Sequence, residues 1–97
     1  MEKEYRIDAY HSDSKVVLEV EAGRGAKGNA VYRDLIHMPL IVDADYAAIA
    51  VPIEYRFRVR GKVIREPAYG KNYDLLDAIY SSGRLKLPFR GGLLIGY

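Results

Sequence analysis

The clearest hydrophobic alternation in the chain lies over residues 16–21, where aliphatic and charged side chains take turns. Side chains two residues apart in a strand share a face. Glu19 and Glu21 therefore share one face, and three aliphatic residues share the other. The two carboxylates would lie about 7 Å apart along the backbone and repel each other. A counter-charge has to hold them there, and a divalent metal ion is one candidate.

The residues before this strand predict its partner. Residues 5–10 have a strand pattern, residues 11–14 are turn-forming and residues 15–22 form the second strand, so the two strands make a hairpin. With the turn at that place, Asp8 lies on the face of both glutamates, diagonal to Glu19. A slip of one residue would move Asp8 to the opposite face, so its position depends on this register.

The rest of the chain switches between helical and strand patterns. Helical spacing of apolar residues is followed by an unbroken apolar run, by strict alternation with arginine, and by a second helical stretch. We expect a helix over 26–37, a buried strand over 46–53, a projecting hairpin over 54–66 with a tight turn at Gly61-Lys62, a helix over 73–81 between Asn72 as N-cap and Gly83, and a strand over 93–97. The order strand, strand, helix, strand, hairpin, helix, strand predicts one α/β domain spanning residues 1–97.

Composition narrows the class of protein. The chain has 97 residues, of which 49% are hydrophobic and 29% are charged, as in an ordinary globular domain. The sequence contains no cysteine, which excludes disulfides and thiolate metal sites and fits a cytoplasmic protein. No apolar run approaches the length of a membrane span, and the charged N-terminus is unlike a signal peptide.

Charge is unevenly distributed along the chain. Residues 1–21 hold six acids against three bases, whereas residues 54–71 hold six bases against two acids. Such a pairing suits a site that handles a polyanion through metal ions. The predicted hairpin turns four cations to one side, where they would bind nucleic acid: Arg56, Arg58, Arg60 and Lys62. The alternative is a solvated edge that uses charge to prevent sheet aggregation.

The loop over residues 23–28 matches the pattern G-x-G-x-x-G between a strand and a helix. A dinucleotide site is disfavoured, because the preceding strand carries two glutamates and the chain is too short for a doubly wound sheet. Arg24 and Lys27 at a helix N-terminus suit a nucleic-acid phosphate instead. Asn29 and Arg33 share another face of that helix and are further candidates for nucleic-acid binding. Glycines that serve only a tight turn are the simpler alternative.

The acids suggest specific chemistry. Mg²⁺ prefers oxygen ligands, typically one or two carboxylates completed by water and substrate phosphate. Asp8 and Glu19 can supply those carboxylates, and Glu21 can orient or deprotonate the attacking water. A bound metal would lower the pKa of that water and stabilise the leaving oxygen. The alternative is an exposed strand face on which Glu19 pairs with Arg6.

An acid on one strand, a turn, and then Leu18-Glu19-Val20-Glu21 on the next strand resembles the PD-(D/E)XK nuclease superfamily, in the restriction-endonuclease-like branch where glutamate replaces the usual lysine. The stretches 21–24, 29–35 and 45–46 add to the resemblance. It implies a mixed sheet flanked by helices, Asp8 and Glu19 as metal ligands, Glu21 in the place of the lysine, and Mg²⁺ or Mn²⁺ as cofactor. The usual N-terminal helix is missing, since only residues 1–4 precede the first strand.

The sequence therefore predicts a metal-dependent endonuclease that hydrolyses phosphodiester bonds of double-stranded DNA by metal-activated water. Two-fold duplex symmetry favours a homodimer, or a partner subunit that completes the fold. Two alternatives stay open: a non-catalytic nucleic-acid-binding module or subunit of a larger nuclease, and a structural or interaction protein. Binding of Mg²⁺ or Mn²⁺ separates the first hypothesis from the others.

Overall fold

The structure is a computed structural model that describes residues 7–21, 30–84 and 86–97. Its elements follow the predicted order of strand, strand, helix, strand, hairpin, helix and strand. They are β1 (Ala9–His11), β2 (Val16–Val20), α1 (Ala30–His37), the 3₁₀ turn η2 (Met38–Leu40), β3 (Tyr46–Val51), β4 (Tyr55–Val59), β5 (Lys62–Glu66), α2 (Ala68–Ser82) and β6 (Gly91–Gly96). The sequence predicted that the usual N-terminal helix is missing because only residues 1–4 precede the first strand. Those four residues lie outside the described part.

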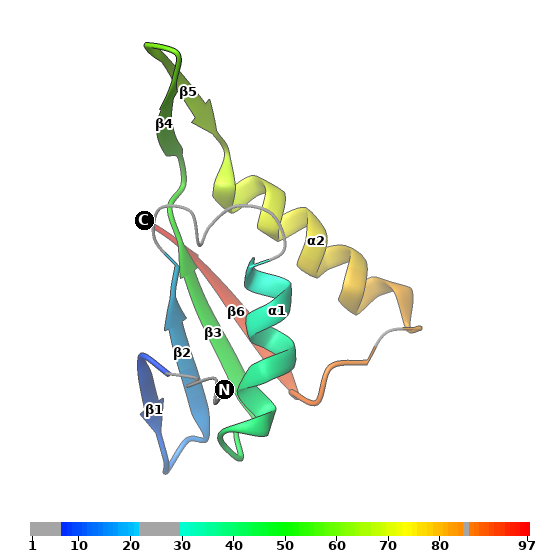
Figure 1. Cartoon of the computed structure of the whole chain (residues 1–97). Coiled ribbons are helices and arrows are strands. Elements are labelled where there is room, and N and C mark those ends of the chain that lie inside the picture. The colour runs from blue at the N-terminus through cyan, green and yellow to red at the C-terminus, as the bar shows by residue number, and fades with distance from the viewer. Residues whose placement is uncertain (1–6, 22–29, 85) are drawn as a thin grey trace, which may run out of the picture.

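A four-stranded mixed sheet in the order β1-β2-β3-β6 forms the body of the molecule (Figure 1). β2, β3 and β6 run parallel, and β1 is an antiparallel edge strand. The apolar composition of β3 explains its central place, because a strand flanked on both sides has little access to water. Its residues 47–51 are all buried, as predicted. The protein is thus α/β, with a mixed sheet and two helices.

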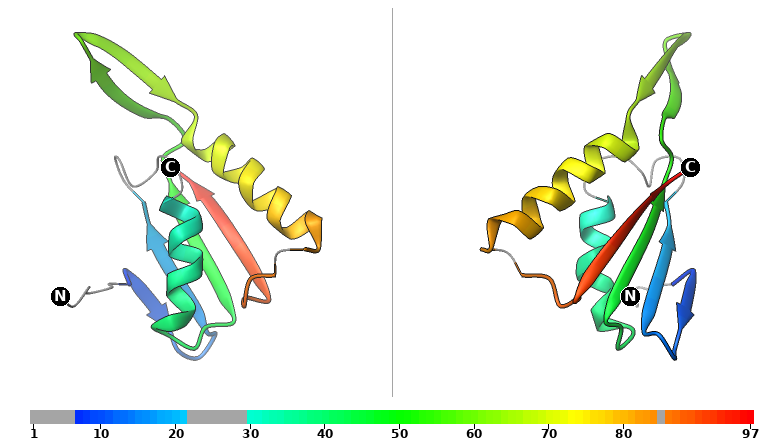
Figure 2. Two further views of the ribbon diagram at one scale, coloured as in Figure 1. Left: turned by 45° about the vertical axis from the view of Figure 1, so that its right-hand side comes forward. Right: turned by 180° about the vertical axis from the view of Figure 1, so that it is seen from behind.

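The core lies between α1 and one face of the sheet. Val31, Leu35 and Met38 repeat at helical spacing and pack on a sheet surface that includes Val17 and Ile49. All five are at most 2% exposed. α2 packs at the margin of the same core, beside β6 (Figure 2). In the described part of the chain no helix covers the other face of the sheet.

The β1–β2 hairpin differs from the predicted register by two residues. Ala9 pairs with Leu18 and His11 with Val16, because the loop spans residues 12–15 and Lys15 adopts a positive φ of 55°. A shift of two preserves which side chains share a face. Asp8 therefore stays on the glutamate face, but it lies across from Glu19 instead of diagonal to it.

β4 and β5 form a separate two-stranded hairpin that projects from the sheet (Figure 1) and is here called the basic arm, residues 55–66. Its turn consists of Arg60 and Gly61, both with positive φ, as expected for a two-residue hairpin loop. The predicted turn at Gly61-Lys62 was wrong by one residue. Lys62 consequently pairs with Val59, which places it on the face opposite Arg58.

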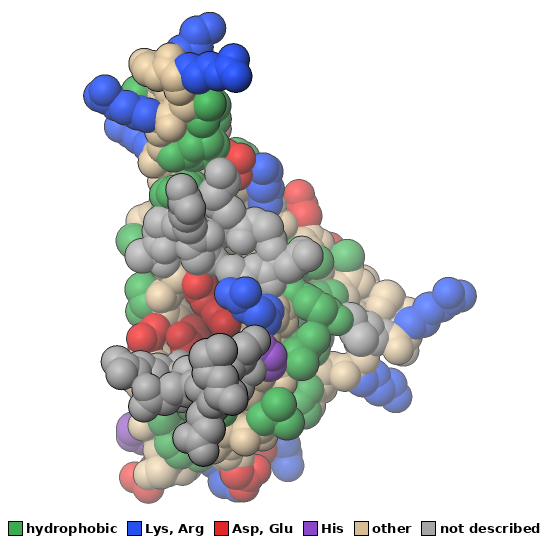
Figure 3. Space-filling model, in the orientation of Figure 1, with side chains coloured by type: hydrophobic (Ala, Val, Ile, Leu, Met, Phe, Trp, Pro, Cys, Tyr) green, Lys and Arg blue, Asp and Glu red, His purple; other side chains and the backbone are tan. Residues whose placement is uncertain are grey.

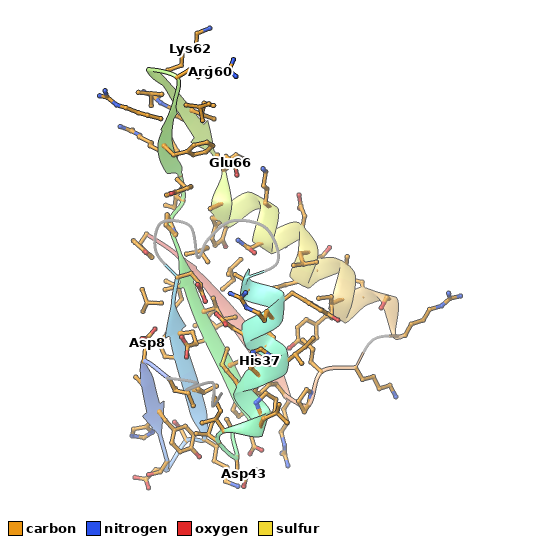
Figure 4. All side chains as sticks on the ribbon, viewed as in Figure 1. Asp8, His37, Asp43, Arg60, Lys62 and Glu66 are labelled. Carbon is orange, nitrogen blue, oxygen red and sulfur yellow. The ribbon has the colours of Figure 1, made fainter. Side chains whose placement is uncertain are left out.

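The predicted single-sided row of cations is therefore wrong for Lys62. Cross-strand partners share a face, and Arg56 pairs with Arg65 while Arg58 pairs with Val63. Arg56, Arg58 and Arg65 share one face of the basic arm. Arg60 lies in the turn, and Figure 4 places it beside Lys62 at the tip.

α2 begins five residues earlier than predicted, directly after Pro67. Asn72 is not its N-cap. It lies inside the helix, is 4% exposed, and donates a hydrogen bond from Nδ2 to the carbonyl of Ala68. Gly83 ends the helix in a left-handed conformation, as predicted. Neither helix of the described residues has the length and apolar character needed to cross a bilayer.

The end of β6 is where three parts of the fold meet. A Cβ atom at Gly96 would lie 2.9 Å from Ile53 Cγ1, at the base of the basic arm, and 2.9 Å from Tyr69 Cδ2, in the first turn of α2. Real Cβ atoms essentially never approach so closely. Glycine is required here for close packing, because β6, the arm base and α2 leave no space for a side chain.

Candidate metal centre

Three carboxylates from two elements converge on the face of the sheet that α1 covers. They belong to Glu19 in β2, Glu21 directly after it, and Asp34 in α1, and are here called the acidic cluster. One ligand oxygen from each lies within 4.8 Å of the other two. The predicted pairing of Glu19 and Glu21 on one strand face is consistent with this arrangement. Figure 3 shows the acidic side chains gathered beside α1.

Glu21 is the most constrained member of the acidic cluster. Its amide donates to the carbonyl of Ala50 at 2.8 Å, and its own carbonyl accepts a hydrogen bond from the Tyr97 hydroxyl at 2.6 Å. The residue is only 8% exposed. These contacts join the end of β2 to β3 and to the residue after β6, so the position of the Glu21 backbone is set by the sheet.

Asp8 lies next to the acidic cluster without belonging to its three converging oxygens. Its Oδ2 accepts a hydrogen bond of 2.6 Å from the amide of Val20, the residue between the two glutamates. Figure 4 shows Asp8 at the β1 side of the sheet and His37 on α1. Asp8 itself is exposed.

The electrostatics show that the carboxylates repel one another. Burial, followed by the nearby charges of Asp8 and Asp34, raises the pKa of Glu19 to about 7. Burial also raises the pKa of Asp34, although the charge of His37 one turn further along α1 opposes that shift. The ionised form of Glu19 is thus unfavourable without a counter-charge.

The donor set fits a hard divalent cation. All three side chains offer oxygen, the ligand type that Mg²⁺ and Mn²⁺ prefer. Two oxygens that bind one magnesium ion at about 2.1 Å lie at most about 4.2 Å apart, and the three oxygens of the acidic cluster all lie within 4.8 Å of one another, so they are close to the spacing that one ion requires. Among the described residues, no lysine or arginine forms an ion pair with the acidic cluster.

A cavity between the helices and the sheet is a different feature from the acidic cluster. It has a volume of about 370 Å³, lies between both helices and the strands β3 and β6, and has a mostly apolar lining that includes Leu35, Ile49 and Tyr73. None of the three clustered carboxylates lines it. Because its one carboxylate, Asp77, has no acidic neighbour there, the acidic cluster is the better candidate for metal chemistry.

The predicted nucleic-acid contacts are placed in part. Arg33 is exposed on α1, and the basic arm carries Arg56, Arg58 and Arg60 together with Lys62, all exposed. Figure 3 shows basic side chains gathered at the end of the arm. The remaining candidates lie outside the described residues: Arg24, Lys27 and Asn29. Among the described candidates, Arg33 thus lies on α1, and the four cations lie on the basic arm.

Asp34 was missed by sequence reasoning. The available signal was its position three residues after Val31 and directly before Leu35, which places it at the margin of the apolar stripe of α1. A polar side chain at that margin points towards the edge of the buried surface. Its proximity to Glu19 depends on how α1 crosses β2, which the helical pattern alone does not determine.

Comparisons with known proteins do not assign the chain to a class. No family model matches it, and neither the curated proteins nor the solved structures contain a significant match.

Proposed function

We propose that the protein is a metal-dependent endonuclease that hydrolyses phosphodiester bonds in double-stranded DNA. The convergence of Glu19, Glu21 and Asp34 from β2 and α1 is the observation that carries the proposal. The α/β fold, with a hairpin, a helix and a buried strand around these acids, supports the proposal, which takes its restriction-endonuclease-like form from the resemblance of the sequence. Mg²⁺ or Mn²⁺ is the proposed cofactor.

In this proposal Glu19 and Asp34 hold the cation, and Glu21 orients the attacking water. The resemblance to the nuclease superfamily implies that Asp8 is a metal ligand. Asp8 lies beside Glu19 and can complete the site. A bound divalent cation would lower the pKa of the attacking water and offset charge on the phosphate. The chain contributes the fixed positions: β2 and the Tyr97 hydrogen bond hold Glu21, and the core residues of α1 hold Asp34.

The basic arm supplies the proposed contacts to the DNA backbone. The arm has three arginines on one face and two cations at the tip. This positive charge can attract phosphates and lies away from the acidic cluster, whose negative charge would repel them. The two-fold symmetry of a duplex favours two sites for cleavage of both strands. The proposal therefore includes a homodimer or a partner subunit.

The decisive experiment is incubation of the purified protein with plasmid DNA, with and without Mg²⁺ or Mn²⁺. We expect cleavage only with metal. Glu19→Ala should slow it by more than about 100-fold, because metal-assisted charge stabilisation contributes several kcal/mol, and should leave DNA binding intact.

The matched control is Asp74→Ala, which removes an exposed acid of α2 outside the acidic cluster. It should cleave like the wild-type protein. Undiminished cleavage by Glu19→Ala would exclude the acidic cluster as the catalytic site.

A non-catalytic nucleic-acid-binding module is the second candidate. The basic arm favours it, because the arm forms a sheet of its own that contains none of the clustered acids. It predicts DNA binding that depends on Arg58 and Arg60, with neither cleavage nor saturable Mn²⁺ binding. Isothermal titration with Mn²⁺ alone distinguishes the two, since only the first proposal requires metal at the acidic cluster.

A further inference from the structure

The face of the basic arm that carries three arginines has an unfavourable arrangement. Arg56 and Arg65 are direct cross-strand partners in an antiparallel hairpin. Like charges placed directly opposite each other in such a pair are destabilising. A structure that brings two guanidinium groups together at this position needs a group that holds them.

Glu54, the residue before β4, is that group. Its Oε1 atom lies 3.3 Å from Nε of Arg56 and 3.3 Å from Nε of Arg65. One carboxylate oxygen thus contacts both arginines of the cross-strand pair. Both contacts use Nε, the inner nitrogen of the guanidinium group.

A guanidinium group has five N–H donors, and only one of them is on Nε. The contacts with Glu54 therefore leave the terminal nitrogens of Arg56 and Arg65 available. Both side chains are well exposed, at 62% and 64%. Exposed ion pairs add little to folding stability, so the main effect of Glu54 is on the orientation of the two side chains.

We propose that Glu54 is a positioning residue for nucleic-acid binding. It holds Arg56 and Arg65 side by side so that their terminal nitrogens can both donate hydrogen bonds to one backbone phosphate. Paired planar guanidinium groups match the geometry of phosphate oxygens. The inference rests on the proposed function, in that the basic arm is taken to contact DNA.

The sign of one effect separates this role from simple charge balance. If Glu54 only neutralises the arginines, its removal makes the arm more positive and strengthens binding to a polyanion. If Glu54 positions the arginines, its removal weakens binding even though the arm becomes more positive. Glu54→Gln keeps an oxygen acceptor for Nε, whereas Glu54→Ala does not.

The test is fluorescence anisotropy with a short labelled DNA duplex over a salt series. Glu54→Ala should weaken binding roughly 3- to 10-fold and lower the log–log salt slope by about one, as for one lost phosphate contact. Glu54→Gln should bind within about twofold of the wild-type protein or more tightly. The thermal unfolding midpoint should be unchanged in both variants. A shift of the midpoint would instead indicate that Glu54 has a purely structural role.

Glu66→Ala is the matched control. Glu66 is the other acid at the arm base, pairs with Tyr55 on the opposite face, and contacts Lys71 at 3.3 Å. Its removal should leave binding unchanged or stronger. Equal or tighter binding by Glu54→Ala would overturn the positioning role.

The double variant Arg56→Ala/Arg65→Ala, measured beside the wild-type protein, distinguishes failure of this inference from failure of the function on which it rests. Absence of DNA binding by the wild-type protein would remove the function on which the inference rests. Wild-type affinity in the double variant would remove only Arg56 and Arg65 from DNA binding, and the positioning role with them, and would leave the contacts of Arg58 and Arg60. Weaker binding by the double variant, together with unweakened Glu54→Ala, would remove only the role of Glu54.

Discussion

The acidic cluster and the basic arm differ in how the fold supports them, although both belong to one small domain. The cluster stands on elements whose core side chains are almost completely buried, and Glu21 is hydrogen-bonded through both its amide and its carbonyl. The arm has a sheet of its own, and most of its residues are exposed. The core thus fixes the positions of the acidic cluster, whereas the cations of the arm lie outside the core.

The arm depends on local interactions for its own shape. A lone two-stranded hairpin is marginal in water, and here it is supported by a turn with two positive φ angles and by the stacked rings of Tyr55 and Phe57, 5.5 Å apart. At its base, the amide of Ile53 donates to the Tyr97 carbonyl at 2.7 Å. Tyr97 therefore contacts both regions, since its hydroxyl binds the backbone of Glu21.

The largest expected contrast is in stability. Leu35→Ala should lower the free energy of unfolding by about 2–5 kcal/mol, because it opens a cavity beneath the helix that carries Asp34. Val63→Ala, at a position that is 54% exposed in the arm, should change it by less than about 0.5 kcal/mol. Urea denaturation measures both. Similar losses in the two variants would show that the arm is part of the core and end the contrast.

A smaller effect tests which side of the arm meets DNA. Arg58→Ala should lower the log–log salt slope of duplex binding by about 0.9, because one phosphate contact is lost. Lys62→Ala should lower it clearly less, since the two-residue turn places Lys62 on the other face. Filter binding across a salt series gives the slopes. Equal losses would mean that both faces of the arm contact DNA and that the arginine face has no special role.

A further expected effect is a pH dependence of stability that arises in the acidic cluster. Because the pKa of Glu19 rises from its usual 4.5 to about 7, the folded metal-free protein binds more protons than the unfolded chain between those values. Stability should therefore fall as the pH rises through this window. Urea denaturation at several pH values measures the trend.

Glu19→Gln should flatten that trend, and arm variants should leave it unchanged. Added Mn²⁺ should stabilise the protein more above pH 7 than below it, because the ionised carboxylate is the ligand. A pH profile that is the same in Glu19→Gln as in the wild-type protein would assign the titration to another group.

Element types were predictable from the sequence because each depends on local periodicity. The alternation around Glu19 indicated a strand with two acids on one face, and the apolar run over β3 indicated a buried strand; both agree with the structure. The start of α2 was not predictable from Asn72, because Pro67 begins the helix earlier and Asn72 finds its partner inside it.

The face on which a strand side chain lies was predictable only where an error in register was an even number of residues. Asp8 kept its face because the register shifted by two residues, whereas Lys62 changed face because the turn moved by one. Asp34 reached the acidic cluster through the path of α1 over the sheet. That path is decided by packing between segments far apart in the sequence, which no local pattern contains.

The contact at Gly96 has a mechanical consequence. The side chains of Ile53 and Tyr69 occupy the space that a side chain at Gly96 would need. This contact lies at the base of the arm, which extends about 23 Å from Ile53 to the turn. A rotation of about 5° at the base would displace the tip by about 2 Å, more than a direct hydrogen bond to a phosphate tolerates. The close packing that glycine permits at residue 96 therefore helps to fix the angle at which the arm leaves the sheet.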